Sequence, residues 1–252
     1  MELKSDVGLS VPPTFAPGAS EHLLTGGRLL RRAFLATPVR LADRDAVIVA
    51  ADDREPPALL IRRGVAYRSF TLSDGRRAIV DILLPGDFAG IDHAVLGRSN
   101  HDIIAASTLG YRLLSAAALR ELMADPQITL RALAVMGEAR WRSDRHMTAV
   151  IRFDAHGRIA AFLLGMYDRL RRRELISRPT FNLPLTQEQM ADHLGLTMVH
   201  VSRTMRRLRE ERLVLMDRHV VIIFDLDGLR RVASGLPPLN APEISPPIES
   251  AE

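Results

Sequence analysis

The 252-residue sequence has no cysteine, a single lysine and few aromatic residues. The lack of cysteine excludes disulfides, cysteine-ligated iron–sulfur clusters and thiol switches. No apolar run approaches the roughly 20 residues that a membrane span needs. The N-terminal residues also lack the continuous apolar core of a signal peptide. We therefore expect a cytoplasmic protein that has no membrane partner.

Basic charge comes almost entirely from arginine, because Lys4 is the only lysine among 34 basic residues. The formal net charge is only +4, so the charge of the whole chain does not by itself predict a nucleic-acid partner. The placement of arginines on one helix is more informative. The content of 47% hydrophobic and 25% charged residues is typical of a globular protein, and the length allows two domains with their own cores.

The segment from Leu185 to Val214 has the pattern of two short helices joined by a tight turn. Thr186 and Gln189 form a capping box, which satisfies free backbone groups at the start of a helix. Gly195 supplies the turn that ends this helix. The buried face of the helix is expected to consist of Met190, Ala191 and Leu194.

A second helix is predicted after Thr197, which is a plausible N-cap. One face of this helix is apolar, with Val201, Met205 and Leu208 at helical spacing. The other faces carry Ser202, Arg203, Arg206, Arg207 and Arg209. A helix with an apolar back and an arginine-rich front suits the DNA major groove. An ordinary solvated helical hairpin is the structural alternative, and we interpret the segment as DNA-binding.

The N-terminal half has short β-type runs separated by turn residues. These runs cover residues 46–50, 58–72, 77–84, 102–107 and 111–115. Many short strands at close spacing indicate a sandwich or a jelly-roll barrel. The predicted fold class is α+β, with an N-terminal jelly-roll or β-roll domain, a long dimerisation helix and a C-terminal winged helix-turn-helix domain.

Five segments follow from these patterns. The two ends are rich in proline and lack apolar periodicity, so we expect them to be disordered. The proposed boundaries are a disordered arm at 1–22, an effector-type β-roll domain at 23–124, a long dimerisation helix and hinge at 125–153, a winged helix-turn-helix domain at 154–234 and a disordered tail at 235–252.

The long helix is predicted to begin at Asp125-Pro126 and to reach about Arg152. An apolar stripe along it contains Leu130, Leu133, Gly137, Trp141, Asp144, Met147 and Ile151. Such a stripe pairs with its copy across a two-fold axis or packs on its own barrel, and one helix can do both. We expect a homodimer, in which the polar Asp144 fixes the register.

The chain around the helix-turn-helix completes a winged domain. Phe153-Asp154 is predicted to form a hinge, in which Asp154 caps the next helix. After the second helix, residues 213–216 and 220–224 are predicted to form a hairpin, the wing, which is able to touch the DNA backbone. A last helix is expected at residues 226–234.

This order of parts resembles the Crp/Fnr family of bacterial transcription regulators over about residues 25–225. The resemblance lies in LPLTQEQMADHLGLTMVHVSRTMRRLREERLV, in FDAHGRIAAFLL at the hinge and in LLPGDFAG at 83–90. It implies a homodimer that binds a palindromic promoter site in double-stranded DNA and contacts RNA polymerase. It also implies a small-molecule effector or another signal in the β-roll that repositions the DNA-binding domains.

The expected effector pocket contains Gly90, Ile91, Asp92, His93 and His101. Family members that bind cyclic nucleotide have a glutamate after the glycine, where this chain has Ile91, and an arginine–serine pair that Arg98-Ser99 matches only in an earlier position. A buried phosphate without a charged partner is costly, and Asp92 and Asp102 would repel it. We therefore do not expect cyclic AMP to bind.

Iron–sulfur clusters and heme are two other groups that the resemblance brings into question. The oxygen-sensing branch uses cysteine-bound iron–sulfur clusters, which a chain without cysteine cannot hold. Heme is an open alternative because His93 and His101 flank the expected pocket and neutral imidazole binds iron. A histidine in a loop is more often a hydrogen-bonding residue. A different small molecule, or no effector, is the favoured interpretation, and the cofactor stays unknown.

The resemblance assigns the DNA contacts residue by residue. Arg203 matches the arginine that reads guanine at O6 and N7. Many members have a glutamate at the position of Val199, which can touch only a thymine methyl group. The expected base-reading set is Arg203, Ser202, Val199 and His200, and the expected backbone contacts are Thr186, Gln187, Thr197 and Arg206.

A ligand-binding or scaffold module and a cupin-type metalloenzyme are the two alternative classes of function. A ligand-binding or scaffold module would use its C-terminal domain to contact protein. A cupin-type metalloenzyme would need several histidines and a glutamate on neighbouring strands, and His93 and His101 have no such neighbours in the sequence. We therefore predict a protein that is not an enzyme and has neither catalytic residues nor a metal site.

Overall fold

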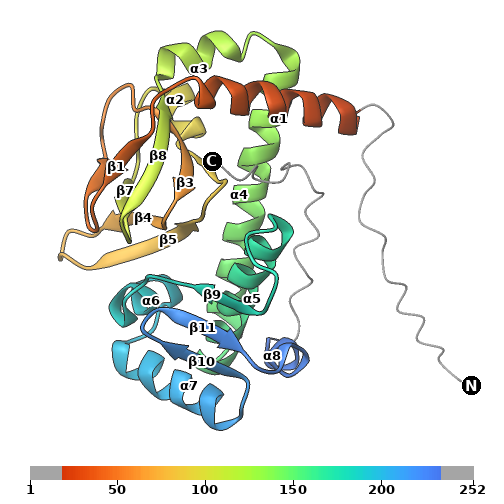
Figure 1. Cartoon of the computed structure of the whole chain (residues 1–252). Helices are drawn as coiled ribbons and strands as arrows, with labels where there is room; N and C mark the ends of the chain where they lie inside the picture. The colour runs from red at the N-terminus through yellow and green to blue at the C-terminus, as the bar shows by residue number, and fades with distance from the viewer. Residues whose placement is uncertain (1–18, 234–252) are drawn as a thin grey trace, which may run out of the picture.

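A computed structural model describes residues 19–233. The β-rich domain lies at one end of the molecule and the helix-turn-helix domain at the other, with one long helix running past both (Figure 1). No helix within the described range is long and apolar enough to cross a membrane. The predicted tail at 235–252 and residues 1–18 of the predicted arm lie outside the described residues.

The first helix, α1 (Ala19–Leu35), corrects one predicted boundary. Residues 19–22 were expected to belong to the disordered arm, but they start this helix. Leu23, Leu30 and Phe34 recur at helical spacing and are buried, which explains why the segment folds against the domain. The helix crosses the long helix so closely that a Cβ added at Gly26 would lie 2.0 Å from a backbone oxygen.

The N-terminal domain is a β-roll of two four-stranded antiparallel sheets, as predicted. One sheet has the order β1 (Arg40–Ala42), β8 (Leu109–Leu114), β3 (Ala58–Arg63) and β6 (Phe88–Ala89). The other has the order β2 (Val47–Val49), β7 (Asp102–Ala105), β4 (Ala66–Thr71) and β5 (Arg77–Leu83). Apolar side chains from both sheets fill the interior between them.

One short helix lies within this domain, and two more helices follow its last strand. The sequence analysis did not predict the first of these, α2 (Ile91–Leu96), which lies between β6 and β7 and ends at a left-handed Gly97. Helix α3 (Ala116–Leu122) and, as expected, the long α4 (Pro126–Arg152) follow, and the side chains of Ser115 and Asp125 cap their first turns.

The C-terminal domain is a winged helix-turn-helix. Its elements are α5 (Ala155–Arg172), β9 (Thr180–Asn182), α6 (Gln187–Leu194), α7 (Met198–Glu210), β10 (Val214–Asp217), β11 (Val220–Ile223) and α8 (Leu226–Val232). The hinge, the wing hairpin and the last helix lie where the sequence placed them. Strand β9 was not predicted; it pairs with β11 and makes the wing a three-stranded sheet.

Two buried carboxylates tie the β-roll to the helices beyond it. Asp87, only 4% exposed, contacts Arg169 of α5 at 2.5 Å and Arg173, the C-cap residue of that helix, at 2.6 Å. Asp81 on β5 contacts Arg142 of α4 at 2.9 Å and Arg68 of β4 at 3.3 Å. Burial would raise the pKa of Asp81, but the neighbouring arginines outweigh it and lower that pKa to about 2. Both carboxylates are therefore charged and paired at neutral pH.

The first helix of the helix-turn-helix also touches the β-roll directly. The ring of His193 on α6 is buried and lies 3.0 Å from the carbonyl oxygen of Ile79 on β5, measured from Nδ1. Burial, and then the nearby His146, lower the pKa of His193 to about 3. The ring is therefore neutral at pH 7, and its Nδ1–H donates to Ile79.

Loss of the Asp87 carboxylate should destabilise the fold. Replacing Asp87 by Asn leaves two buried arginines with too little negative charge, and breaking a buried ion pair costs about 3–5 kcal/mol. Urea unfolding should show a lower free energy of unfolding by about this amount. The same substitution at Asp74, half-exposed in a surface turn, is the control and should change it little. Equal effects at both positions would contradict the assigned role of Asp87.

The buried His193 should make stability depend on pH. Its ordinary pKa is 6.5 and its folded pKa is about 3, so between these values the unfolded chain binds a proton that the folded chain does not. The free energy of unfolding therefore falls as the pH drops through this window, by at most about 1.4 kcal/mol per pH unit. Urea unfolding from pH 7 to pH 4 should show a shallower decline for His193→Gln than for the wild type. Replacing the exposed His200 by Gln should leave the decline unchanged.

Candidate nucleic-acid interface

The two helices of the predicted motif are held in place by their caps. Thr186 and Gln189 form the complete capping box at the start of α6. Gly195 ends α6 with a φ of +62°, a left-handed conformation that favours glycine. Thr197 accepts a hydrogen bond from the backbone of His200 and so caps α7. The local signals that predicted the motif are therefore the contacts that build it.

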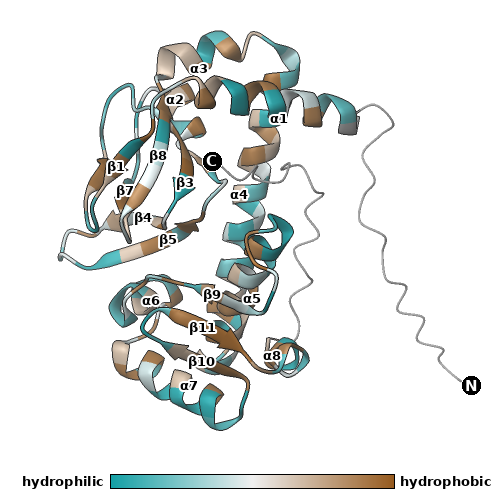
Figure 2. Ribbon diagram, in the orientation of Figure 1, coloured by the Kyte–Doolittle hydropathy of each residue, from teal (hydrophilic) through white to brown (hydrophobic). Residues whose placement is uncertain are grey.

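Helix α7 has a buried side and a solvent side. Val201, Thr204 and Leu208 face the domain core and are buried. The exposed residues are Met198, Val199, His200, Ser202, Arg203, Arg206, Arg207, Arg209 and Glu210. Figure 2 shows the contrast: the wing hairpin is largely hydrophobic, and α7 is largely hydrophilic. All four predicted base-reading residues thus lie on the open side of one helix.

The arginines of α7 differ in their surroundings. Arg206 and Arg207 each make an exposed ion pair one turn along the helix, with Glu210 and Glu211, at 2.8 Å. Such exposed pairs contribute little free energy, so either arginine can exchange its partner for a phosphate. Arg203 makes no ion pair or hydrogen bond within residues 19–233. Its guanidinium is therefore free to contact a base in the DNA major groove.

Three of the four residues predicted to contact the DNA backbone lie at the N-terminal ends of α6 and of α7, the recognition helix. Thr186, Gln187 and Thr197 are all exposed at the N-terminal ends of α6 and α7. The two threonine hydroxyls already accept hydrogen bonds from the backbone, and each keeps its proton to donate to a phosphate oxygen. Helix N-termini also carry partial positive charge, which favours phosphate.

The start of α7 is apolar, a feature that the sequence interpretation captured only in part. Met198 and Val199 are 54% and 55% exposed, and they follow directly after the cap. Met198 was not included in the predicted base-reading set, although it lies directly before Val199, the first residue of that set. Apolar side chains in this position can contact the methyl groups of thymine but cannot accept a hydrogen bond from cytosine.

The predicted stripe of α4 is exposed on the outside of the molecule. Leu133, Trp141, Met147 and Ile151 are 57%, 45%, 51% and 68% exposed, and Leu130 is 37% exposed. A Cβ added at Gly137 would meet nothing within 4 Å. Within the same stripe, Asp144 makes an ion pair with Arg140 of its own helix. The helix buries a different side, through Ile128, Ala132 and Ala149, against its own chain.

A cavity of about 190 Å³ lies between the β-roll and α4. It contains three of the predicted effector-pocket residues, Gly90, Ile91 and Asp92. The sequence analysis missed its arginines, Arg68, Arg140 and Arg142, because two of them come from the long helix and one from β4. Asp102 does not line the cavity; its carboxylate accepts a hydrogen bond from the backbone of Ala51. Arg98 pairs with Asp52 on the surface instead.

His93 and His101 do not line this cavity, which corrects their predicted placement. His93 lies in α2, not in a loop, and both rings are buried with centroids 4.2 Å apart. Ser99 and Asn100 occupy both ring nitrogens of His93, at 3.0 Å each. Burial, and then Arg68 and His93, lower the pKa of His101 to about 3. The two rings therefore act as neutral packing and hydrogen-bonding groups.

An exposed, arginine-bearing helix in a winged domain, joined by a long helix to a β-roll, defines a DNA-binding regulator with an attached sensor-type domain. Residues 157–232 match the family model of the Crp-like helix-turn-helix domain. The chain is 31% identical over 191 residues to the transcriptional activatory protein AadR of Rhodopseudomonas palustris, covering 76% of this chain and 79% of that protein. It belongs to the Crp/Fnr family of bacterial transcription regulators.

Other relatives agree. The nitrogen fixation regulation protein FixK of Rhizobium meliloti is 34% identical, over 74% of this chain and 83% of its own length. The structure of FixK2 from Bradyrhizobium japonicum has the same fold, with a TM-score of 0.72 and 24% identity, over 80% of this chain and 99% of that one. AadR and the FixK of Rhizobium meliloti are regulators and not enzymes, which agrees with the prediction for this chain and argues against the cupin-type alternative. Residues 19–233 also contain no group of three potential metal ligands.

Proposed function

We propose that the protein acts in the cytoplasm as a homodimer that binds a palindromic promoter site and contacts RNA polymerase. The observation that carries this proposal is the exposed, unpaired Arg203 at the centre of the recognition helix. Helix-turn-helix proteins of this kind bind two half-sites about one helical turn apart, which requires two copies of the helix. The exposed stripe of α4 supplies a surface for pairing the two copies.

The stripe has the spacing of a coiled-coil seam. Leu130, Gly137, Asp144 and Ile151 recur every seven residues, with Leu133 and Met147 between them. Because Gly137 has no side chain, the two helices can approach closely at that level. Asp144 lies at the seam, where a polar residue favours one register. The Arg140 contact partly neutralises its charge within the same helix.

The base-reading set follows from the exposed face of α7. Arg203 reads guanine through two hydrogen bonds, and Ser202 and His200 add polar contacts at neighbouring positions. Met198 and Val199 favour thymine methyl groups over cytosine. A half-site bound by this chain therefore differs from one read through a glutamate at the position of Val199. Thr186, Gln187, Thr197 and Arg206 bind phosphates and set the position of the helix.

The cavity between the β-roll and α4 is the proposed effector site. Arg68 and Arg142 in it already neutralise Asp81, and Ile91 stands where a ribose-binding carboxylate would be needed. This arrangement supports a small molecule other than cyclic AMP, or operation without an effector. A protein-binding scaffold is the alternative function, and the salt dependence of promoter binding separates the two, because phosphate contacts weaken steeply with salt.

Replacing Arg203 by Ala should relax specificity at one base pair. The loss of two hydrogen bonds to guanine should cost about 1–3 kcal/mol on the preferred site and much less on a site changed at that base pair. Quantitative binding to a set of single-substituted sites measures both values. Arg206→Ala, the same substitution one turn away, should weaken binding to all sites alike. If Arg203→Ala also weakens all sites equally, its assignment as a base reader is wrong.

Replacing Leu133 by Glu should prevent dimer formation, because it places charges opposite each other in an apolar seam. Light scattering should report a monomer, and affinity for a full palindrome should fall toward that for a single half-site. Leu41→Glu is a matched control, since Leu41 is 68% exposed on β1 of the β-roll. A dimer in the Leu133 variant would place the dimer surface elsewhere.

A further inference from the structure

The helix-turn-helix domain is attached to the β-roll by packing as well as by the chain. Tyr67, Ile79 and Ile82 of strands β4 and β5 belong to the same buried apolar cluster as Phe162 of α5 and Leu194 of α6. One apolar core therefore runs from the second sheet of the β-roll into the DNA-binding domain, so the orientation of that domain is set by specific contacts across this junction.

Two polar contacts join β5 directly to α6. Arg77 and Asp192 form an ion pair at 2.7 Å, with both side chains between one fifth and one third exposed. The next residue of α6, His193, donates to the carbonyl oxygen of Ile79 at 3.0 Å. Arg77 and Ile79 are alternate residues of one strand, and Asp192 and His193 are neighbours on one helix. The two contacts thus fix both the position and the rotation of α6 against the strand.

The ring of His193 also links α6 to the long helix. It stacks on the ring of His146 from α4, with centroids 4.1 Å apart and an angle of 10° between the planes. On another side it meets Phe162 of α5 edge-on at 5.1 Å. A single side chain of α6 therefore contacts β5, α4 and α5 together, and two neutral imidazoles can stack without repulsion between charges.

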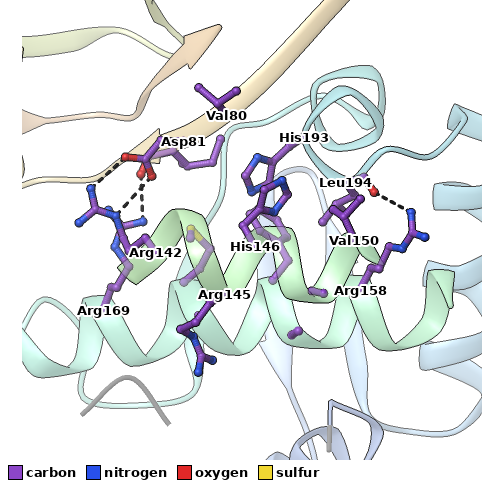
Figure 3. Close-up of a pocket in the computed structure, with 16 residues that line it drawn as sticks. Val80, Asp81, Arg142, Arg145, His146, Val150, Arg158, Arg169, His193 and Leu194 are labelled. Atoms are coloured by element: carbon purple, nitrogen blue, oxygen red, sulfur yellow. Dashed lines mark hydrogen bonds and ion pairs between the residues drawn. The ribbon is translucent and has the colours of Figure 1, made fainter. Parts of the chain in front are cut away.

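A cavity of about 70 Å³ lies beside these rings (Figure 3). In Figure 3 the Asp81–Arg142 contacts stand at one end, the two stacked histidines in the middle and Arg158 at the other end. Arg158 donates to the carbonyl oxygens of Leu194 and Gly195, and so holds the turn between α6 and α7. Some open space therefore remains beside the polar contacts of the junction.

We propose that Arg77, Ile79, His146, Asp192 and His193, which together we term the β5–α6 joint, determine the spacing between the two DNA half-sites that the protein accepts. They are positioning residues, since none of them lies on the exposed face of α7. The inference rests on the proposed homodimer. In that dimer α4 lies at the two-fold axis, and the joint fixes each recognition helix relative to α4.

Spacing is the property that such a joint controls most directly. Each base pair added between half-sites moves one of them by about 3.4 Å and turns it by about 35° around the DNA axis. Two rigidly held recognition helices tolerate neither change. Two loosely held ones can follow the DNA. A looser joint should therefore broaden the accepted spacing while leaving the preferred half-site sequence unchanged.

The test is in vitro selection from DNA that carries two copies of the selected half-site separated by variable spacers, followed by affinity measurements on the sites obtained. The full-length wild type should prefer one spacing and lose roughly tenfold or more in affinity for a change of one base pair, about 1.4 kcal/mol. Asp192→Asn and His146→Ala should reduce this loss to roughly threefold or less. Both variants should select the same half-site as the wild type.

Asp227→Asn is the matched control, because Asp227 makes an exposed ion pair with Arg230 within α8, away from the joint, and it should keep the wild-type spacing preference. Urea unfolding identifies any variant that fails to fold; Asp192→Asn alters only a partly exposed pair and remains informative if His146→Ala does not fold. Folded Asp192→Asn with the full wild-type spacing penalty would overturn the proposal. A wild type that binds single half-sites as a monomer would instead overturn the proposed function.

Discussion

The neutralisation of two buried carboxylates organises this molecule. Asp81 and Asp87 lie in and just after strand β5, where they are almost inaccessible to water, and a charge in such a place must be paired. Arginines of α4 and α5 supply the pairing. Since α4 carries the exposed stripe and α5 opens the DNA-binding domain, one requirement of elementary electrostatics fixes the sensor-type domain, the long helix and the output domain relative to each other.

Much of the fold could be predicted from the sequence because its signals are local. The capping box of Thr186 and Gln189, the left-handed Gly195 and the Asp125-Pro126 start of α4 each act within one helical turn. Helix α1 was missed because its apolar residues follow a proline-rich stretch, and α2 because six residues after PGDFAG give too short a pattern. Strand β9 owes its existence to pairing with β11, a contact that no local signal reveals.

The candidate DNA-binding surface could also be predicted where it depends on signals within a single helix. The exposed side of α7 could be predicted because one helix determines which of its residues share a face. The effector-type cavity was predicted only in part, since its lining joins β4, β5, β6, α2 and α4. Arg142 could not have been assigned to it from spacing along the chain. His93 and His101 were assigned to the cavity because they are close to Gly90 in the sequence. In the structure both rings are buried: the His93 ring hydrogen-bonds with Ser99 and Asn100, and the His101 ring hydrogen-bonds with Asn100. Local chemistry allowed the exposed face of α7 to be either a DNA-binding surface or an ordinary solvated one. Membership of a family of DNA-binding regulators favours the first interpretation.

The Asp81–Arg142 pair has a position that goes beyond stability. The same two side chains line the cavity beside Gly90 and the cavity beside the stacked histidines. They separate a cavity between the β-roll and α4 from a cavity at the junction of β5, α4, α5 and α6. A displacement of either side chain changes the shape of both cavities at once. The proposed effector site and the junction with the DNA-binding domain are thus separated by a single ion pair.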